Sequence, residues 1–293
     1  MNRLARVLVV SAVLTTFCLM AGCAARKHAF DFGDPESGLT LQYRVSEGDV
    51  LPYRFNSTFE QTMELMGQKM STTSAQMLTF SMTSLGGAPD HRVAIELTGM
   101  ELTVNTPQGD IEADPSTVVG RTFEMTLSPR GEESDLPDPS AVVYVAGPQG
   151  EQSVIPGFAT MFPDLPDSPV VVGDSWPSSA VIEEDGETTN MTVSMDIINT
   201  FEGVEEVDGV SCARVRTSFV GLLEGGGEQQ GMPWTIMADM EGTGYWLFDY
   251  ASGTFLEEVS EGSATGTIET STPGGDMEIP LVREFLMTTE LIR

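Results

Sequence analysis

Residues 51–65 read LPYRFNSTFEQTMEL, and most of their apolar side chains fall on the odd positions. The even positions are mostly polar or charged, among them Arg54, Glu60 and Glu64. A period of two is that of a β-strand, in which successive side chains point to opposite faces of a sheet. The stretch therefore predicts a long strand with one buried face and one face in water.

The residues that follow extend this strand into a sheet. Gly67-Gln68 separates it from a second alternating run, Met70 to Met82, and the pair predicts a long hairpin. In a third run, His91 to Val104, the apolar parity switches near Gly99, which indicates a β-bulge. Further strands are predicted at 121–127, 189–201, 210–219, 234–240, 244–249, 255–268 and 277–292. We predict an all-β protein built from long, strongly curved antiparallel sheet.

Alternation stops between residues 129 and 169, where eight of the 17 prolines lie. Proline removes a backbone donor and fixes φ, so we predict a Pro-rich connector on the surface, with a short helix near Val154 to Phe162. The connector separates a first β unit, residues 39–128, from a second, residues 170–293.

One repeat links the two units. Gly48-Asp49-Val50-Leu51-Pro52 recurs as Gly173-Asp174-Ser175-Trp176-Pro177, and each copy precedes a predicted strand and hairpin. Because Gly-Asp is a common turn pair, the repeat leaves open whether the two β units are related by duplication.

The N-terminus has the pattern of a cleavable signal. Arg3 and Arg6 precede an apolar run, Val7 to Met20, which is shorter than the roughly 20 residues that a membrane-spanning helix needs. The junction Leu19-Met20-Ala21-Gly22-Cys23 resembles the bacterial lipobox.

This resemblance implies that residues 1–22 are removed and that Cys23 is lipidated. Residues 23–38 then form the acylated cysteine and a polar tether that holds the chain at a membrane surface. In Gram-negative lipoproteins, Asp after the cysteine retains the protein at the inner membrane. Ala24 stands there instead, so the outer membrane is favoured. The alternative is an ordinary signal cut near Ala21.

Composition excludes several partners. Two of the 14 basic residues and none of the 44 acidic ones lie in residues 1–22, so the remainder carries 12 basic and 44 acidic residues. Such a charge repels phosphate backbones, and we predict no nucleic-acid partner. The acids are spread through turns, as on a solvated surface, and none of these turns has the ligand spacing of a calcium loop. We assign no metal-ligating residue and predict no cofactor, and the acidic turns leave calcium binding open.

Catalytic groups are sparse. His28 and His91 are the only histidines, and no nucleophile motif or zinc-ligand spacing accompanies them. Cys212 lies in a strand-like context and is predicted to be a small buried apolar residue. Carboxylate pairs are too numerous to single one out, so we assign no catalytic residue and predict no enzyme.

The apolar strand positions are rich in Met and Phe. Met is flexible and polarizable, which suits both core filling and an adaptable binding surface. The candidate apolar ligand face is Leu51, Phe55, Phe59, Met63, Phe80, Met191 and Met195.

Several phrases resemble an uncharacterised family of secreted, Thr-rich, strand-rich bacterial lipoproteins, a domain of unknown function. They are Met66-Gly67-Gln68-Lys69-Met70, residues 122–131 (TFEMTLSPRG), Phe162-Pro163-Asp164-Leu165-Pro166 and Val172-Gly173-Asp174-Ser175-Trp176. The resemblance implies a fold and no catalytic residues.

In architecture alone, the predicted chain is also similar to the half-barrel lipoprotein carriers of the Lol type. We interpret the chain as a non-enzymatic envelope lipoprotein that binds a lipid-like apolar ligand or a protein partner. The alternatives are a structural or assembly lipoprotein with a filled core and, third, an acid-catalysed hydrolase.

Overall fold

Strand β3 (Val50–Leu65) and strand β4 (Gln68–Gly86) form the long antiparallel hairpin that the alternation predicts. Tyr53 lies opposite Phe80 in this pairing, and both are buried, whereas Thr58 and Glu60 on the other face are exposed. The predicted division of β3 into a buried face and a wet face is confirmed.

The computed structural model describes residues 30, 32–65, 67–107, 109–146, 150–186, 189–229, 231–272 and 275–293, and Phe32–Arg293 is one compact unit. The predicted signal peptide, Cys23 and residues 24–29 and 31 of the predicted tether lie outside the described residues.

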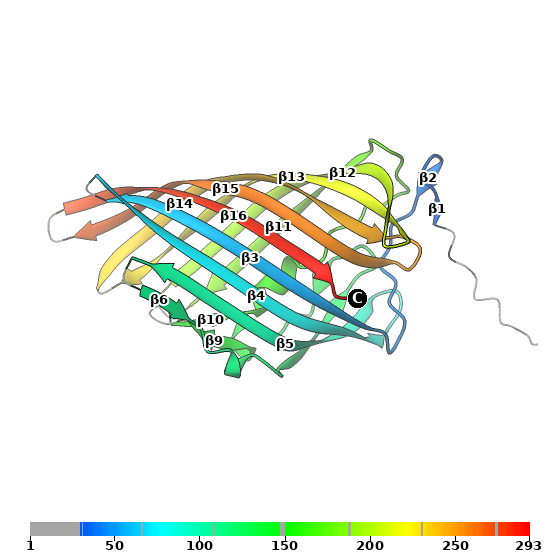
Figure 1. Ribbon diagram of the computed structural model, residues 1–293, viewed down its shortest axis with the longest axis horizontal. Helices are drawn as coiled ribbons and strands as arrows, with labels where there is room; N and C mark the ends of the chain where they lie inside the picture. The colour runs from blue at the N-terminus through cyan, green and yellow to red at the C-terminus, as the bar shows by residue number, and fades with distance from the viewer. Residues whose placement is uncertain are drawn as a thin grey trace, which may run out of the picture. The chain divides into compact units, whose positions relative to one another are not determined.

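The described residues form an antiparallel sheet of 12 strands that joins both predicted β units (Figure 1). Its order is β11-β12-β13-β14-β15-β16-β3-β4-β5-β7-β8, with β6 paired to β5. The remaining bounds are β5 (His91–Thr106), β6 (Gly109–Glu112), β7 (Thr122–Leu127), β8 (Glu133–Ser134), β11 (Ser175–Asp185), β12 (Thr189–Val207), β13 (Val210–Gln229), β14 (Met232–Asp249), β15 (Thr254–Thr272) and β16 (Gly275–Leu291). Because β16 pairs with β3, strands β3 to β7 of the first predicted unit and strands β11 to β16 of the second lie in one continuous sheet.

Shorter elements accompany this sheet. They are the strand pair β1 (Gly33–Asp34) and β2 (Gly38–Leu39), the pair β9 (Val143–Val145) and β10 (Glu151–Ser153), and three 3₁₀ helices, η1 (Pro115–Thr117), η2 (Pro139–Ala141) and η4 (Ile155–Thr160). Helix η4 occupies the place where a short helix is predicted. Asp114 and Asp138 cap η1 and η2 by accepting backbone N–H bonds.

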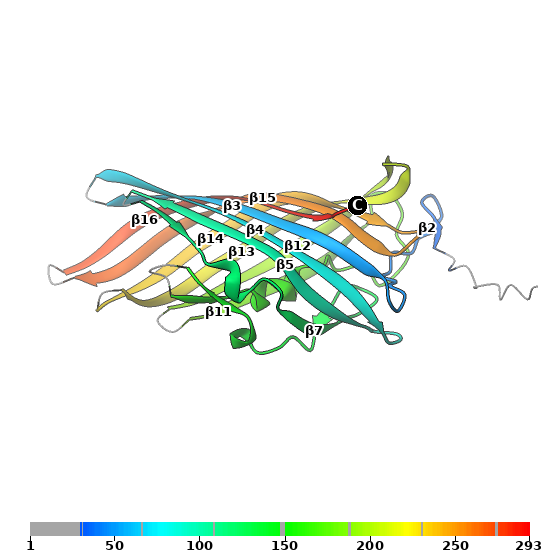
Figure 2. The same ribbon diagram turned by 60° about the horizontal axis from the view of Figure 1, so that its bottom comes forward.

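Part of the connector is buried, so the prediction that it packs on the surface is wrong for that part. Ile155, Phe158 and Phe162 are buried in the main hydrophobic core with Tyr53 and Phe80. Figure 2 shows this segment, coloured green, beneath the curved sheet and between β7 and β11. A sheet with an apolar inner face must bury that face against something, and the connector supplies part of the cover.

The two Gly-Asp phrases build the same turn. Asp49 Oδ2 accepts from the Ser46 backbone N–H and Asp174 Oδ2 from that of Val171, each at 2.9 Å. The N–H groups of Gly48 and Gly173 donate to strands β4 and β12 at the carbonyls of Ser84 and Phe201, both at 2.9 Å. The repeat thus extends from sequence to structure, and its origin by duplication stays a prediction.

The predicted bulge is also present. Thr79 pairs with Gly99 and Phe80 with Leu97, so Thr98 is the extra residue of β5. Its insertion explains why apolar parity changes between the two halves of this strand.

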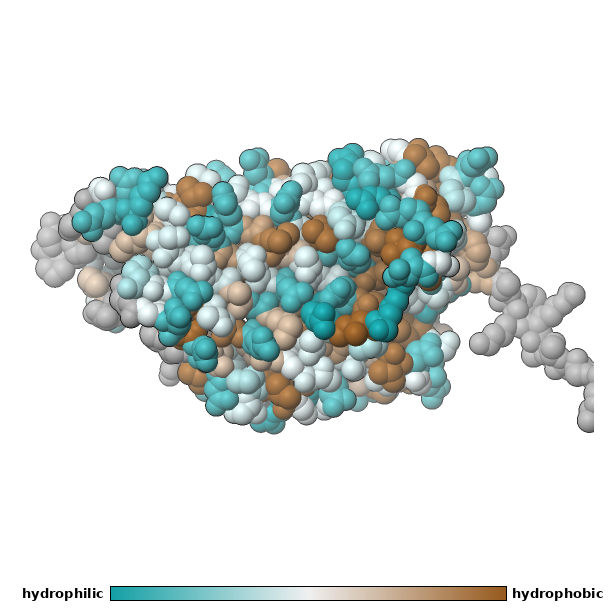
Figure 3. Space-filling view, in the orientation of Figure 1, coloured by the Kyte–Doolittle hydropathy of each residue, from teal (hydrophilic) through white to brown (hydrophobic). Residues whose placement is uncertain are grey.

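The outer face of the sheet is polar. On β15 its positions include Glu257, Glu261, Ser263 and Glu269, and the Glu60 carboxylate of β3 lies opposite Glu284 of β16. Apolar side chains such as Val220 are scattered among them, and Figure 3 shows small brown patches in a mainly teal and white surface. A surface of this composition suits water.

Candidate functional site

One end of the inner face is filled by aromatic side chains. Tyr53 stacks on Phe80 with ring centroids 5.5 Å apart and on Phe255 at 6.0 Å, while Phe158 from the connector meets Phe80 edge-on at 5.0 Å. The Tyr53 hydroxyl donates to the Phe255 carbonyl at 2.9 Å, which satisfies its buried polar group. This main core leaves no room for a ligand beside Phe80.

The opposite half of the inner face holds a second apolar cluster. Its buried members are Leu223, Ile236, Ala238, Ala264 and Leu281, and partly buried side chains including Met63 and Met191 pack against them. The inner face is therefore closed by packed side chains in two separate places.

Between the two clusters, aromatic rings lie flat over glycines. Phe219 and Phe285 stack at 6.1 Å, and Phe59 lies 6.3 Å from Phe285. A Cβ at Gly262 would meet the Phe285 ring at 2.7 Å, and one at Gly242 would collide with Phe219. The missing side chains let both rings approach the backbone closely.

Arg283 lies next to this aromatic row and points inward from β16. Its Nε and Nη2 donate to Gln61 Oε1 at 3.2 and 2.7 Å, and its guanidinium carbon lies 5.6 Å from the centre of the Phe59 ring. Among the described residues, no carboxylate lies within 4.0 Å of the guanidinium. Arg283 is thus fixed by a neutral partner and an aromatic face.

Glu184 of β11 faces Arg283 although five strand-to-strand steps of the sheet separate them. Burial raises the pKa of Glu184, and the Arg283 charge opposes that rise. Burial likewise lowers the pKa of Arg283, against the effect of Glu184. The sheet therefore curls far enough for Glu184 on β11 and Arg283 on β16 to interact electrostatically across its inner face.

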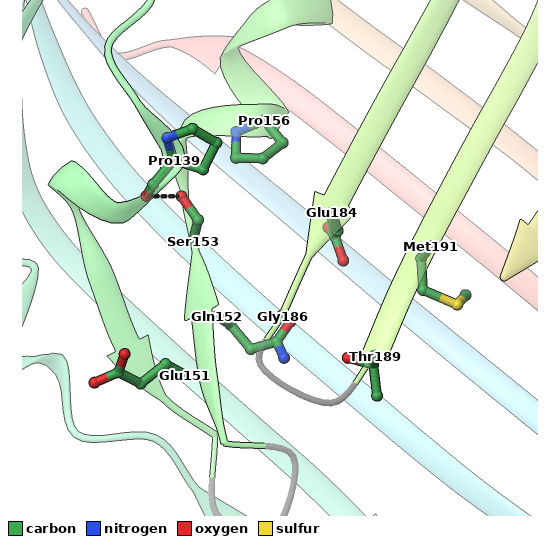
Figure 4. A pocket seen from close by; sticks show the side chains of 9 residues that line it. All are labelled: Pro139, Glu151, Gln152, Ser153, Pro156, Glu184, Gly186, Thr189 and Met191. Atoms are coloured by element: carbon green, nitrogen blue, oxygen red, sulfur yellow. Dashed lines mark hydrogen bonds between the residues drawn. The ribbon is translucent and has the colours of Figure 1, made fainter. Parts of the chain in front are cut away.

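A small pocket of about 40 Å³ adjoins Glu184 at the open edge of the sheet. Figure 4 shows Glu184 and Met191 on the neighbouring strands β11 and β12, with Ser153 across the pocket on the connector, where its hydroxyl donates to the Pro139 carbonyl at 2.6 Å. A pocket of this volume has room for water molecules and is too small for a lipid chain.

A row of polar side chains crosses the inner face beside the main core. Glu258 accepts from the Ser260 hydroxyl at 2.9 Å, and burial raises the pKa of Glu258. Asn199 accepts from the Trp246 ring N–H at 3.2 Å. The buried hydroxyls of Ser57 and Thr217 have no hydrogen-bond partner among the described residues, so this row retains unused polar capacity.

A second group of carboxyls holds the connector in place. Glu133 accepts the Phe162 backbone N–H at 2.8 Å, and burial, with a smaller contribution from Asp164, raises the pKa of Glu133 to about 8. Because its oxygen is bound to the backbone, Glu133 has a structural role that accounts for its burial.

All seven residues of the predicted ligand face do point inward, but they differ in what covers them. Phe80 is fully buried in the main core, against which Leu51 and Phe55 pack, and Met63 and Met191 pack on the second cluster. Phe59 and Met195 lie between the clusters and are partly exposed. Cys212 is buried, as predicted, and burial raises the pKa of its thiol.

The inward position of Arg283 was missed in the sequence. Arg283 occupies one of the odd-numbered positions of its strand, which otherwise hold apolar residues such as Leu281, Phe285 and Met287. This alternation is the sequence signal that identifies its inward position. Glu258, at an inward position of β15, carries the same signal.

No protein-family model matches the chain, and no curated protein is similar to it. Solved structures that match the chain include an outer membrane channel from Pseudomonas putida F1, at 8% identity and TM-score 0.30, covering 85% of this chain and 97% of that one. OccK2 (OpdF) of Pseudomonas aeruginosa has 7% identity and a TM-score of 0.24, and the match covers 84% of this chain and 98% of that one. OccK11 (OpdR) of the same species has 8% identity and a TM-score of 0.21, and the match covers 86% of this chain and 100% of that one. At these scores the chain paths differ, and we draw nothing about function from them.

In the described part of the chain, no helix is long and apolar enough to cross a membrane.

Proposed function

We propose that this chain is a non-enzymatic lipoprotein of the bacterial outer membrane, anchored through Cys23, and that it binds a lipid-like ligand on the middle of its inner face. The anchor is supported by the Leu19-Met20-Ala21-Gly22-Cys23 junction and by Ala24. The polar outer face of the sheet supports a folded part that lies in water.

One observation carries the ligand proposal. Apolar inward side chains keep accessible surface between the two clusters, at Phe59, Met195 and Met287, and at the edge of the second cluster, at Met240. Accessible surface on an inward side chain requires a space in front of it at least as large as a water molecule. Removing a hydrocarbon chain from water in such a place contributes about 0.8 kcal/mol per CH₂.

The two packed clusters favour a second candidate. Buried side chains fill both ends of the inner face, as expected of a structural or assembly lipoprotein that carries no ligand. In that case Phe59 and the Met side chains between the clusters complete a core, and the protein acts through its outer surface on an envelope partner.

The anchor is tested by the Cys23→Ala variant. We expect it to be released as soluble protein, while intact-mass analysis of the unmodified chain finds a mature form that begins at acylated Cys23 and lacks residues 1–22. A processed N-terminus without acyl mass would contradict lipidation.

The ligand is tested on the same soluble variant, because it lacks acyl chains of its own. We expect lipid to co-purify with it, and Phe59→Asn to weaken binding of an apolar fluorescent dye by about tenfold. Asn adds polarity without a charge that could pair with Arg283. Thr58→Asn, on the exposed outer face of the same strand, is the matched control and should bind dye normally.

Stability distinguishes the two candidates. If Phe59 lines a binding space, Phe59→Asn lowers the free energy of unfolding by about 1–2 kcal/mol, whereas Phe80→Asn in the main core costs more than about 3 kcal/mol. If both variants lose the same free energy of unfolding, and the protein binds neither lipid nor dye, the carrier proposal fails and the structural role replaces it.

A further inference from the structure

Arg283 differs from the basic side chains on the outer face. There, Arg54 pairs with Glu290 at 2.9 Å and Arg92 pairs with Glu124 at 2.7 Å. The chain carries 44 acidic residues against 14 basic ones, so acids are abundant. Yet Arg283 points inward, and its hydrogen bonds go to the neutral amide of Gln61.

The surroundings of the guanidinium leave room on one side. Across from Arg283 on β15 stands Ala264, and the adjoining inward positions of that strand are Gly262 and Gly266. These side chains are too small to cover the guanidinium, which remains partly exposed. A guanidinium has five N–H donors, and the bonds to Gln61 use two of them.

The inward carboxyls do not pair directly with this charge. Among the described residues, neither Glu184 nor Glu258 forms an ion pair with Arg283, and Glu184 acts on it only over a longer distance. Arginine stays protonated in proteins. Partial burial of a cation without a paired anion costs free energy, and an oxyanion that accepts two parallel N–H bonds from a guanidinium offsets this cost.

We infer that the ligand is an amphiphile with an acidic headgroup, whose carboxylate or phosphate binds Arg283 while its hydrocarbon chain lies against Phe59, Met195 and Met240. This inference rests on the proposed function, since it names the class of ligand for the same inner face. Phe59 contacts the guanidinium and the space beside it, so one side chain adjoins both the headgroup and the start of the chain.

The test compares a fluorescent polyene fatty acid with its methyl ester, which has the same chain and no charge. On Cys23→Ala protein we expect the acid to bind at least about tenfold more tightly than the ester. Arg283→Gln should abolish this preference by weakening the acid alone, and Arg283→Lys should restore part of it. Arg92→Gln removes one positive charge from the outer face and should leave the preference intact.

Every other outcome contradicts one named part of the proposal. Equal binding of acid and ester to the unmodified inner face would overturn the headgroup inference and leave the carrier standing. Binding of neither would overturn the carrier itself. Acetate and inorganic phosphate should fail to displace the acid; displacement by either would identify a site for small anions and overturn the amphiphile. Thermal unfolding of Arg283→Gln verifies that the variant is folded, and loss of ester binding in it would assign Arg283 a purely structural role.

Discussion

Replacing Gly131 with Ala is expected to lower the free energy of unfolding by about 3 kcal/mol. Gly131 has a φ of +98°, a left-handed conformation that costs an L-residue roughly 1–2 kcal/mol. A Cβ at this position would collide with the Pro163 carbonyl oxygen and would lie 2.9 Å from the Tyr43 ring. The remainder of the loss is the cost of moving these groups apart.

The large effect follows from where Gly131 lies. The backbone N–H of Leu165 donates to the Arg130 carbonyl at 2.7 Å, and the Tyr43 hydroxyl donates to the Pro163 carbonyl at 3.0 Å. The Ser-Pro-Arg-Gly phrase and the Phe-Pro-Asp-Leu-Pro phrase therefore dock on each other, and the connector enters the main core at this point.

Gly120→Ala is the matched control. Its φ of +83° is also left-handed, but no atom lies within 4 Å of the added Cβ, so only the conformational part, about 1–2 kcal/mol, should be lost. Denaturant unfolding of both variants in the Cys23→Ala background measures the difference. Equal losses of unfolding free energy in the two variants would show that Pro163 and Tyr43 move away from the added Cβ at no energetic cost.

Raising the pH from about 5 to about 9 is expected to destabilise the protein by on the order of 3 kcal/mol, and Glu133→Gln is expected to remove most of this loss. Burial raises the pKa of Glu133 from 4.5 to about 8. The unfolded chain releases this proton near pH 4.5, whereas the folded protein keeps it until about pH 8. Between these values the folded state binds more protons, so its stability falls as the pH rises and levels off above about 8.

Gln keeps an oxygen that can accept the Phe162 backbone N–H, so the substitution removes the titration and preserves the contact. Glu132→Gln takes the same charge from the exposed neighbour and should leave most of the pH dependence in place. Melting temperatures at a series of pH values measure the slope. A smaller slope remains in Glu133→Gln, because burial also raises the pKa of Glu258 and Asp164. An unaltered slope would mean that Glu133 is ionised in the folded protein at neutral pH.

Local pattern was enough to predict most of the long strands and their faces, although residues 234–240 and 244–249 belong to one strand, β14, and β11 was not among the predicted runs. Alternation in residues 51–65 predicts which side chains of β3 point inward, and the parity change near Gly99 predicts the bulge in β5. These features depend on a period of two and on one inserted residue, both of which lie within a few residues of each other along the chain.

Long-range contacts decided the rest. Alternation specifies the face on which Phe59 and Phe80 lie, but the connector packs on Phe80 and leaves Phe59 partly exposed. The pairing of β16 with β3 brings Arg283 beside Gln61, 222 residues away in the chain, and the curl of the sheet turns Glu184 toward it. The sequence by itself determined which residues face inward. Only the tertiary structure decided which of them are covered, because cover depends on segments that approach from far along the chain and leave no periodic signal.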